Sequence, residues 1–252
     1  MSSGCGTSPV SASTAATFRV AKTVNSAAVQ IIGLGGGGRT EEQQAKLRRY
    51  VLEVAGKERP QICFVPTAVG DATEGIVRFY EQYAGLGELA HLKFFPYPPG
   101  ELRAFTLAQD VLVVSGGNTA NLLAIWRVHG FDAIVREAWQ QGVVLTGGSA
   151  GMICWYEACV TDSFGLQLEG LDDGLGFLAG SACPHYDGEE LRRPVYTRLV
   201  TEGFPSGIAA DDGVGVHYVG TELAEVVTAR EGAQAYRVGP DGEEPLPARL
   251  LG

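Results

Sequence analysis

Short apolar runs alternate with amphipathic stretches over the first 150 residues. Five runs have the length of buried strands: 29–34, 61–66, 89–95, 111–114 and 143–146. Between them, apolar residues recur at helical spacing near 40–56, 73–85, 119–128 and 131–140. Short buried strands alternating with helices predict an α/β fold, with a mostly parallel central sheet and helices on both faces.

The pattern changes after residue 149. A helix is predicted directly after Ser149, followed by a loop-rich stretch and a further helix near 188–203. Residues 207–240 hold short β-type runs broken by Gly and Asp, which predicts a short β-rich C-terminal part with an antiparallel edge or meander. No composition break divides the chain, so we expect one domain over 29–252 after a flexible arm over 1–28.

Charge and cysteine usage narrow the class of protein. The net charge of −10 argues against nucleic-acid binding, because phosphates need a basic surface. No apolar run approaches the ~20 residues that span a bilayer, and the start lacks the pattern of a secretory signal. Five scattered cysteines without a zinc-like spacing are typical of reduced thiols. We therefore expect a cytoplasmic protein with no membrane partner, metal or cofactor; a monomer and a homodimer both stay open.

The most informative segment is Gly147-Gly148-Ser149-Ala150-Gly151, which follows a predicted strand and precedes a helical pattern. A Gly-x-Ser-x-Gly turn of this kind presents its serine above the sheet, and small neighbours avoid clashes across the bend. The N–H group of Ala150 then suits an oxyanion. The alternative is a glycine-rich connection whose Ser149 only caps the helix.

A serine nucleophile needs a base, and the chain has four histidines. His91, His129 and His217 lie in contexts that favour structural positions. His185 lies in the loop Cys183-Pro184-His185-Tyr186-Asp187, downstream of the serine, and is the strongest candidate. A Cys183 nucleophile has less support, because Cys183 lacks a comparable turn.

An acidic residue should orient the imidazole of His185. Asp162 follows the segment after Ser149 and could reach back toward a loop histidine; its alternative role is that of a turn-forming aspartate. Four further candidates cannot be ranked from the sequence: Glu157, Asp187, Glu189 and Asp211.

A second glycine-rich strand end, Ser115-Gly116-Gly117-Asn118-Thr119, could supply further N–H donors. Ligands gather at the carboxyl ends of strands in open parallel sheets. Gly116 and Gly117 can turn their N–H groups toward a substrate, and Asn118 can hydrogen-bond it. A helix N-cap by Asn118 or Thr119 is an alternative that is compatible with this role.

These segments together resemble the peptidase E and cyanophycinase family of serine peptidases. The matching features, in family order over about residues 30–220, are Ser115-Gly-Gly-Asn118-Thr119, Gly148-Ser149-Ala150-Gly151, Thr161-Asp162, Pro184-His185 and the arginines beyond. The resemblance implies a fold related to class I glutamine amidotransferases. It also implies a preference for short peptides with an N-terminal Asp, with cyanophycinase-like cleavage of β-aspartyl-arginine as the alternative.

The resemblance also assigns roles to residues. The serine of the family falls on Ser149, its histidine on His185 and its acid on Asp162. The arginine that binds the acidic side chain falls on Arg192, with Arg193 adjacent, and a guanidinium matches a carboxylate bidentately. Both arginines could instead form a solvated helix face. In the expected mechanism an acyl-enzyme forms on Ser149 and no cofactor takes part.

Two functions from other classes compete with hydrolysis. Gly33-Leu34-Gly35-Gly36-Gly37-Gly38 satisfies the Gly-x-Gly-x-x-Gly pattern of dinucleotide-binding proteins, but the second predicted strand ends in Val65-Pro66-Thr67, without the acidic residue that holds the ribose. The other competitor is a binding protein that kept the substrate pocket and lost catalytic turnover. The presence of the serine, the histidine and the oxyanion glycines argues against it.

Overall fold

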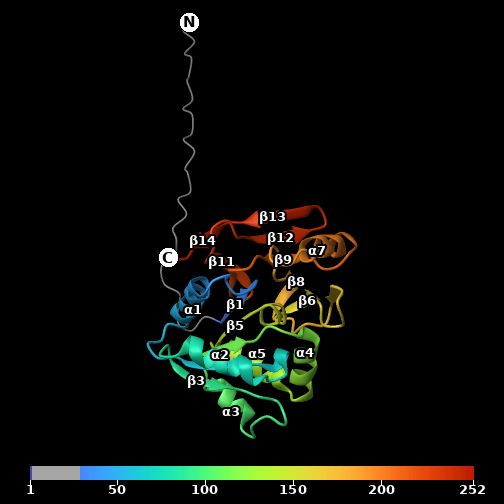
Figure 1. Cartoon of the computed structure of the whole chain (residues 1–252). Helices are drawn as coiled ribbons and strands as arrows, with labels where there is room; N and C mark the ends of the chain where they lie inside the picture. The colour runs from blue at the N-terminus through green and yellow to red at the C-terminus, as the bar shows by residue number, and fades with distance from the viewer. Residues whose placement is uncertain (2–28) are drawn as a thin grey trace.

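The computed structural model describes Met1 and residues 29–252 (Figure 1). Apart from Met1, the predicted flexible arm over residues 1–28 lies outside the described residues, and so does Cys5.

The larger of two sheets has eight strands in the order β14-β11-β10-β1-β5-β4-β2-β3. Five of its strands come from the first part of the chain and pair in parallel with one another, which confirms the predicted parallel sheet. They are β1 (Gln30–Leu34), β2 (Gln61–Val65), β3 (Glu88–His91), β4 (Val111–Val114) and β5 (Val144–Gly148). β10 (Val214–Val219) is antiparallel to β1, β11 (Glu222–Thr228) is antiparallel to β10, and β14 (Ala248–Leu250) is parallel to β11.

Helices cover both faces of this sheet, as predicted. Ile32 faces α1 (Glu41–Ala55) and α2 (Thr73–Tyr83), with which it shares an apolar cluster. The neighbouring side chain of Ile31 points to the opposite face, because successive residues of a strand alternate. That face carries a larger cluster with the remaining helices of this part of the chain: α3 (Leu102–Leu107), α4 (Thr119–Val128) and α5 (Phe131–Gln140).

The predicted start of α1 is confirmed in detail. The Oγ1 atom of Thr40 accepts a hydrogen bond from the N–H of Gln43 at 3.3 Å, and the side chain of Gln43 accepts one from the N–H of Arg39 at 2.8 Å. The helix ends at Gly56, whose φ of 66° is left-handed. Thr40 therefore satisfies one of the free N–H groups at the start of this helix, and Gln43 binds the backbone just before it.

The helix predicted directly after Ser149 is present but short, and the stretch predicted as loop-rich contains strands. α6 spans only Ala150–Ile153, and the chain then forms β6 (Tyr156–Thr161), because the run Tyr156-Glu-Ala-Cys-Val-Thr161 is rich in residues that favour strands. β6 belongs to a second sheet of six strands in the order β13-β12-β9-β8-β6-β7. The other members are β7 (Glu169–Leu171), β8 (Leu178–Cys183), β9 (Gly207–Ala210), β12 (Ala235–Gly239) and β13 (Gly242–Leu246).

The second sheet packs between the large core and one helix. Its side chains at Cys159 and Ala182 join the cluster of the first sheet, whereas Val160 and Ala209 face α7 (Arg192–Thr201). Figure 1 shows β12, β13 and α7 at the end of the molecule opposite to α3. The stretch predicted as loop-rich and part of the predicted β-rich C-terminal part thus form a second sheet. The C-terminal strands β10, β11 and β14 join the first sheet instead.

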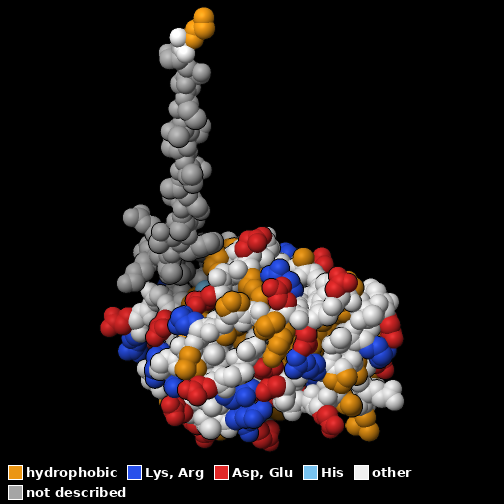
Figure 2. Space-filling model, turned by 90° about the horizontal axis from the view of Figure 1, so that it is seen from above, with side chains coloured by type: hydrophobic (Ala, Val, Ile, Leu, Met, Phe, Trp, Pro, Cys, Tyr) orange, Lys and Arg blue, Asp and Glu red, His pale blue; other side chains and the backbone are white. Residues whose placement is uncertain are grey.

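The surface and the cysteines agree with the composition. Acidic and basic side chains are interspersed over the face shown in Figure 2. Four cysteines are free and buried: Cys63, Cys154, Cys159 and Cys183. None of the helices in residues 29–252 has the length and apolar character that a membrane crossing requires. Within the described chain, no cluster of three or more His, Cys, Asp or Glu side chains is arranged to hold a metal ion.

Candidate active site

Ser149 lies on a strained turn at the carboxyl end of β5. Its φ of 55° and ψ of −118° place a residue with a side chain in a region that L-residues rarely adopt. The side chain makes no capping hydrogen bond to α6, so the alternative of a simple helix cap has no support. A Cβ atom added to Gly116 would lie 3.8 Å from Ser149 Oγ, which places this serine beside the second glycine-rich strand end.

The end of β1 holds Ser149 and His185 at adjacent positions. The carbonyl of Leu34 accepts a hydrogen bond from the N–H of Ser149 at 3.2 Å, and the carbonyl of Gly35 accepts one from the N–H of His185 at 2.8 Å. Leu34 and Gly35 are consecutive residues, and consecutive Cα atoms are about 3.8 Å apart. These two hydrogen bonds therefore hold the backbones of Ser149 and His185 close together. His185 follows β8 of the second sheet, whereas Ser149 follows β5 of the first.

The carboxylate partner of His185 is Asp212. Nδ1 of His185 lies 2.7 Å from Oδ1 of Asp212, and the two side chains are 22% and 19% exposed. Asp212 occupies the turn between β9 and β10, where the chain passes from the second sheet to the first. The prediction that Asp162 orients the imidazole is not supported. Asp162 is 58% exposed, its carboxylate lies 3.9 Å from Arg192, and its carbonyl accepts a turn hydrogen bond from Gly165.

The other acidic candidates bind elsewhere. Glu157 accepts from the N–H of Gly180, and Glu189 pairs with Arg192. Asp211, next to the true partner of His185, points into the protein and accepts from the N–H of Gln234 at 2.9 Å, and burial raises the pKa of its carboxyl. The sequence did contain a signal for Asp212, namely an Asp-Asp-Gly turn that ends a strand downstream of the histidine.

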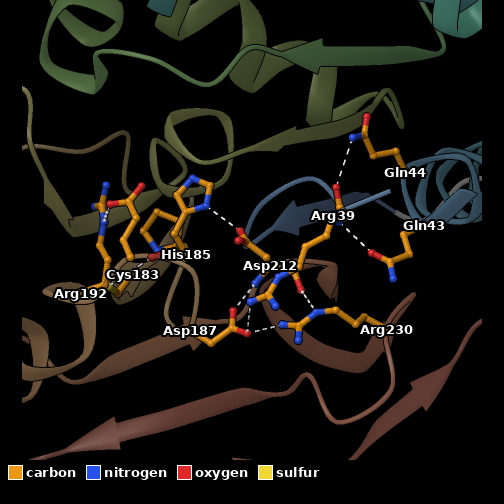
Figure 3. A network of polar contacts seen from close by, with 12 residues as sticks. Arg39, Gln43, Gln44, Cys183, His185, Asp187, Arg192, Asp212 and Arg230 are labelled. Carbon is orange, nitrogen blue, oxygen red and sulfur yellow. Dashed lines mark hydrogen bonds and ion pairs between the residues drawn. The ribbon is translucent and has the colours of Figure 1, made fainter. Parts of the chain in front are cut away.

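Asp187 supports Asp212 from behind (Figure 3). One carboxylate oxygen of Asp187 accepts the N–H of Asp212 at 2.9 Å, and the other pairs with Arg39 at 3.2 Å and with Arg230. Arg230 also donates to the carbonyl of Asp212 at 3.1 Å. Two guanidinium groups therefore fix Asp187, which in turn fixes the backbone that carries the partner of His185.

The glycine run after β1 makes room for this pair. A Cβ atom on Gly36 would lie 2.7 Å from Nδ1 of His185 and would overlap the carboxylate of Asp212. A Cβ atom on Gly35 would overlap the backbone of Asp211. The pattern that resembles a dinucleotide-binding fingerprint is thus explained by the close approach of protein groups.

The glycine-rich strand ends provide free N–H donors. Among the described residues, the N–H groups of Gly116, Gly117 and Ala150 donate no hydrogen bond to another protein group. Asn118 is more committed: its Oδ1 caps α4 by accepting from Asn121 at 2.8 Å, and its Nδ2 donates to the carbonyl of Ser163 at 2.8 Å. The predicted N-cap role of Asn118 is therefore confirmed, and its amide holds the loop after β6 against α4.

The two candidate substrate arginines are engaged within the protein. Arg192 is 3% exposed; it donates to Glu189 at 2.7 Å and to the carbonyl of Val160 at 3.0 Å. Arg193 pairs with Glu243 and lies over the rings of Tyr186 and Tyr236. The interpretation of a solvated helix face fails for Arg192, because its guanidinium is buried.

The other candidate nucleophile, Cys183, and the histidine His217 lie in buried environments that fit structural roles. Burial raises the pKa of the Cys183 thiol, which keeps it protonated, and its Sγ lies 3.6 Å from the carbonyl of Pro184. His217 is 2% exposed and lies between Tyr50 and Gln30 at 2.6 and 2.9 Å, and burial lowers its pKa. The sequence interpretation of His217 as a structural position is confirmed, and the side chain is buried on β10.

The site thus combines a strained serine, a histidine with a carboxylate partner and unpaired N–H groups at two strand ends. This arrangement has the parts that acyl transfer by a hydroxyl nucleophile requires. The fold and site together define a two-sheet α/β protein with the parts of an acyl-transfer site at the strand ends of its first sheet.

Comparisons with known proteins give the family. The model of peptidase family S51 matches residues 31–226, and the chain belongs to this family. The protein is 48% identical over 230 residues to the uncharacterized peptidase YgaJ of Bacillus subtilis (strain 168), covering 88% of this chain and 99% of that one. The predicted resemblance to the peptidase E family is therefore confirmed.

Solved structures share the fold at lower identity. A peptidase from an acI-B1 Actinobacterium matches 88% of this chain and 95% of its own, with a TM-score of 0.62 and 19% identity. A protein of Listeria monocytogenes EGD-e assigned to peptidase E matches 81% of this chain and 99% of its own, with a TM-score of 0.58 and 20% identity. These likenesses confirm the predicted α/β fold.

Proposed function

We propose that this protein is a serine exopeptidase that hydrolyses dipeptides or short peptides through an acyl-enzyme. Ser149 is the nucleophile, His185 the general base and Asp212 the carboxylate that orients the imidazole. The observation that carries the proposal is the 2.7 Å contact between His185 and Asp212 at the strand end that also holds the strained Ser149. Membership of peptidase family S51 supports peptide-bond hydrolysis.

The proposed reaction has two steps. Ser149 Oγ bonds to the scissile carbonyl carbon while His185 takes its proton, and the N–H groups of Ala150 and of Gly116 or Gly117 stabilise the oxyanion. His185 then gives the proton to the amine as the peptide C–N bond breaks. Water, deprotonated by the same imidazole, attacks the acyl-enzyme and releases the acid and free Ser149.

A preference for N-terminal aspartate is the finer part of the proposal. Arg192 is the positional match for the arginine of the family, but its guanidinium already donates to Glu189. An aspartyl carboxylate would therefore have to replace Glu189, whose side chain is 48% exposed and has room to turn into solvent. Glu189→Gln should lower the KM for Asp-X dipeptides and leave that for Ala-X dipeptides unchanged.

Release of the N-terminal residue from Asp-X, Glu-X, Ala-X and β-aspartyl-arginine tests the function. Wild type should cleave at least one dipeptide, and Ser149→Ala should lower kcat by about 10³-fold or more. Circular dichroism of the variant controls for folding. A folded Ser149→Ala protein with the wild-type rate would rule out the proposed nucleophile, and a wild type inert toward the whole panel would rule out the substrate class.

A further inference from the structure

A cavity of about 300 Å³ lies between α1 and α2 over the first sheet. The apolar side chains in its lining include Leu34, Leu47, Val51, Phe64, Phe79 and Val113. At one end it reaches Gly116 and Gly148, which flank Ser149 from two strand ends. We call this cavity the α1–α2 pocket; it adjoins the proposed nucleophile on the face opposite to α4 and α5.

The charged residues that line the α1–α2 pocket are both arginines, Arg48 and Arg78, in a chain whose net charge is −10. Arg78 is exposed, and its guanidinium makes no hydrogen bond or ion pair within residues 29–252. The side chain of Arg48 is 12% exposed; it pairs with Glu41, but its Nε is buried without an acceptor. The pocket therefore presents positive charge beside an apolar interior.

A second unpaired group lies at the end of the pocket near the serine. Ser115 is 7% exposed, and its Oγ has no hydrogen-bond partner within the described chain. Buried polar atoms in folded proteins are normally satisfied by protein or by a bound partner. A cavity with apolar walls, two guanidinium groups and an unpaired hydroxyl suits a ligand with an apolar body and an anionic end.

We propose that the α1–α2 pocket binds the C-terminal residue of the peptide substrate, with an apolar side chain inside and the free α-carboxylate near Arg78 and Arg48. This inference rests on the proposed function. The N-terminal residue of a peptide carries an ammonium group, which two guanidinium groups would repel, and an internal residue carries no backbone charge. The C-terminal residue alone combines an apolar side chain with an obligatory anion, and in a dipeptide it is the leaving group.

Equilibrium binding to the Ser149→Ala protein tests this without turnover. Calorimetry would compare Asp-Leu, Asp-Gly and Asp-Leu amide. Burial of a leucine side chain should make Asp-Leu bind about 10- to 100-fold more tightly than Asp-Gly. Loss of the carboxylate charge in the amide should weaken binding about fivefold.

Gly75 on α2 allows the pocket to be filled. A Cβ atom there would lie 3.7 Å from the ring of Phe64, an ordinary contact, so the helix has room for a side chain at this position. Gly75→Leu should weaken Asp-Leu at least tenfold and Asp-Gly less than twofold. Arg78→Gln should weaken both free acids about fivefold and leave the amide unchanged. Arg49→Gln, which removes an exposed charge outside the pocket lining, is its control.

Three outcomes would overturn the inference: no binding of Asp-Leu to the Ser149→Ala protein, the same Kd for Asp-Leu in a folded Gly75→Leu variant, or an equal effect of Arg78→Gln on acid and amide. Arg78 is exposed, so its variant tests the pocket even if Gly75→Leu does not fold. In each case, Ser149-dependent hydrolysis by the wild type would leave the proposed function standing. The absence of hydrolysis by the wild type would instead contradict the proposed function itself.

Discussion

Two neighbouring strands of the first sheet, β1 and β5, both end in glycine-rich segments, yet the glycines serve different purposes. The strands pair in parallel, with Gly33 opposite Gly147 and Leu34 opposite Gly148. At the end of β5 and the start of α6, Gly147 and Gly151 lie against the backbone of Val114, where a Cβ atom on either would overlap the carbonyl. After β1, Gly36 lies against the side chains of the candidate active site, His185 and Asp212.

The comparison shows that a glycine run indicates the close approach of another part of the protein but not which groups approach. At β5, the missing side chains let α6 start directly over β4, which places Ser149 at the turn. At β1, the missing side chain of Gly36 leaves the space that His185 and Asp212 occupy. Substitutions at the two ends should therefore fail in different ways: at β5 through folding, and at β1 through the site.

The largest expected effect concerns the group for which Gly36 makes room. Asp212→Asn keeps the size of the side chain but removes the charge that stabilises the imidazolium and selects its tautomer. We expect kcat to fall by about 10³- to 10⁴-fold, as in triads of this kind. Asp162→Asn, the matched change at the acid expected from the sequence, should alter kcat less than about threefold. Steady-state kinetics on the best dipeptide measures both, and a reversed ranking would restore Asp162.

Gly36→Ala should damage activity while leaving the sheet intact. The new methyl group would displace the carboxylate of Asp212 and press on Nδ1 of His185, so kcat should fall by about 10²-fold or more. Gly37→Ala is the control, because its Cβ atom would be no closer than 3.7 Å to Gln44. Equal activity of the two variants would show that the run does not shape the site.

Gly147→Ala should instead destabilise the fold. Its Cβ atom would meet backbone atoms, with Gly151 Cα at 2.9 Å, and backbone cannot move aside as a flexible side chain can. We expect a loss of about 2–3 kcal/mol in the free energy of unfolding. Gly148→Ala, whose nearest contact is 3.8 Å from the Leu34 carbonyl oxygen, should cost less than about 1 kcal/mol. Urea denaturation separates the two, and equal midpoints would contradict this account of β5.

The smallest effect should come from Asp187, which acts on the site through Asp212. Asp187→Asn keeps an oxygen that can accept the N–H of Asp212 but weakens the ion pairs with Arg39 and Arg230. We expect kcat to fall about three- to tenfold with KM nearly unchanged. Arg39→Gln, which removes the more exposed of the two guanidinium partners, should have a smaller effect. An Asp187→Asn variant that raises KM alone would place Asp187 in substrate binding.

The fold was predictable where each element buries a continuous apolar pattern. α4 and α5 occupy the predicted ranges 119–128 and 131–140, and β4 spans the predicted 111–114. After Ser149 the predicted helix is present but has a single turn, and the stretch predicted as loop-rich begins with β6. Trp155 is fully buried against Trp126 of α4 and Phe177 just before β8, so packing against residues distant in sequence fixes that boundary.

The residues of the site were predictable where a local sequence motif identifies them. Ser149 lies in a turn that its own neighbours dictate, and His185 lies in a recognisable loop. Asp212 was missed because it follows His185 by 27 residues and stands next to Asp211 in a short turn. Which of two adjacent aspartates faces the histidine depends on how the turn between β9 and β10 packs against the rest of the protein.

By itself, the sequence determined the parallel sheet, the strained serine and the family, because each depends on residues close together in the chain or on motifs in a fixed order. The tertiary structure decided the partner of His185, the internal pairing of Arg192 and the existence of the α1–α2 pocket. Each of these depends on how two sheets and two helices approach one another. The free energies that set such approaches come from contacts between residues far apart in sequence, which local patterns do not encode.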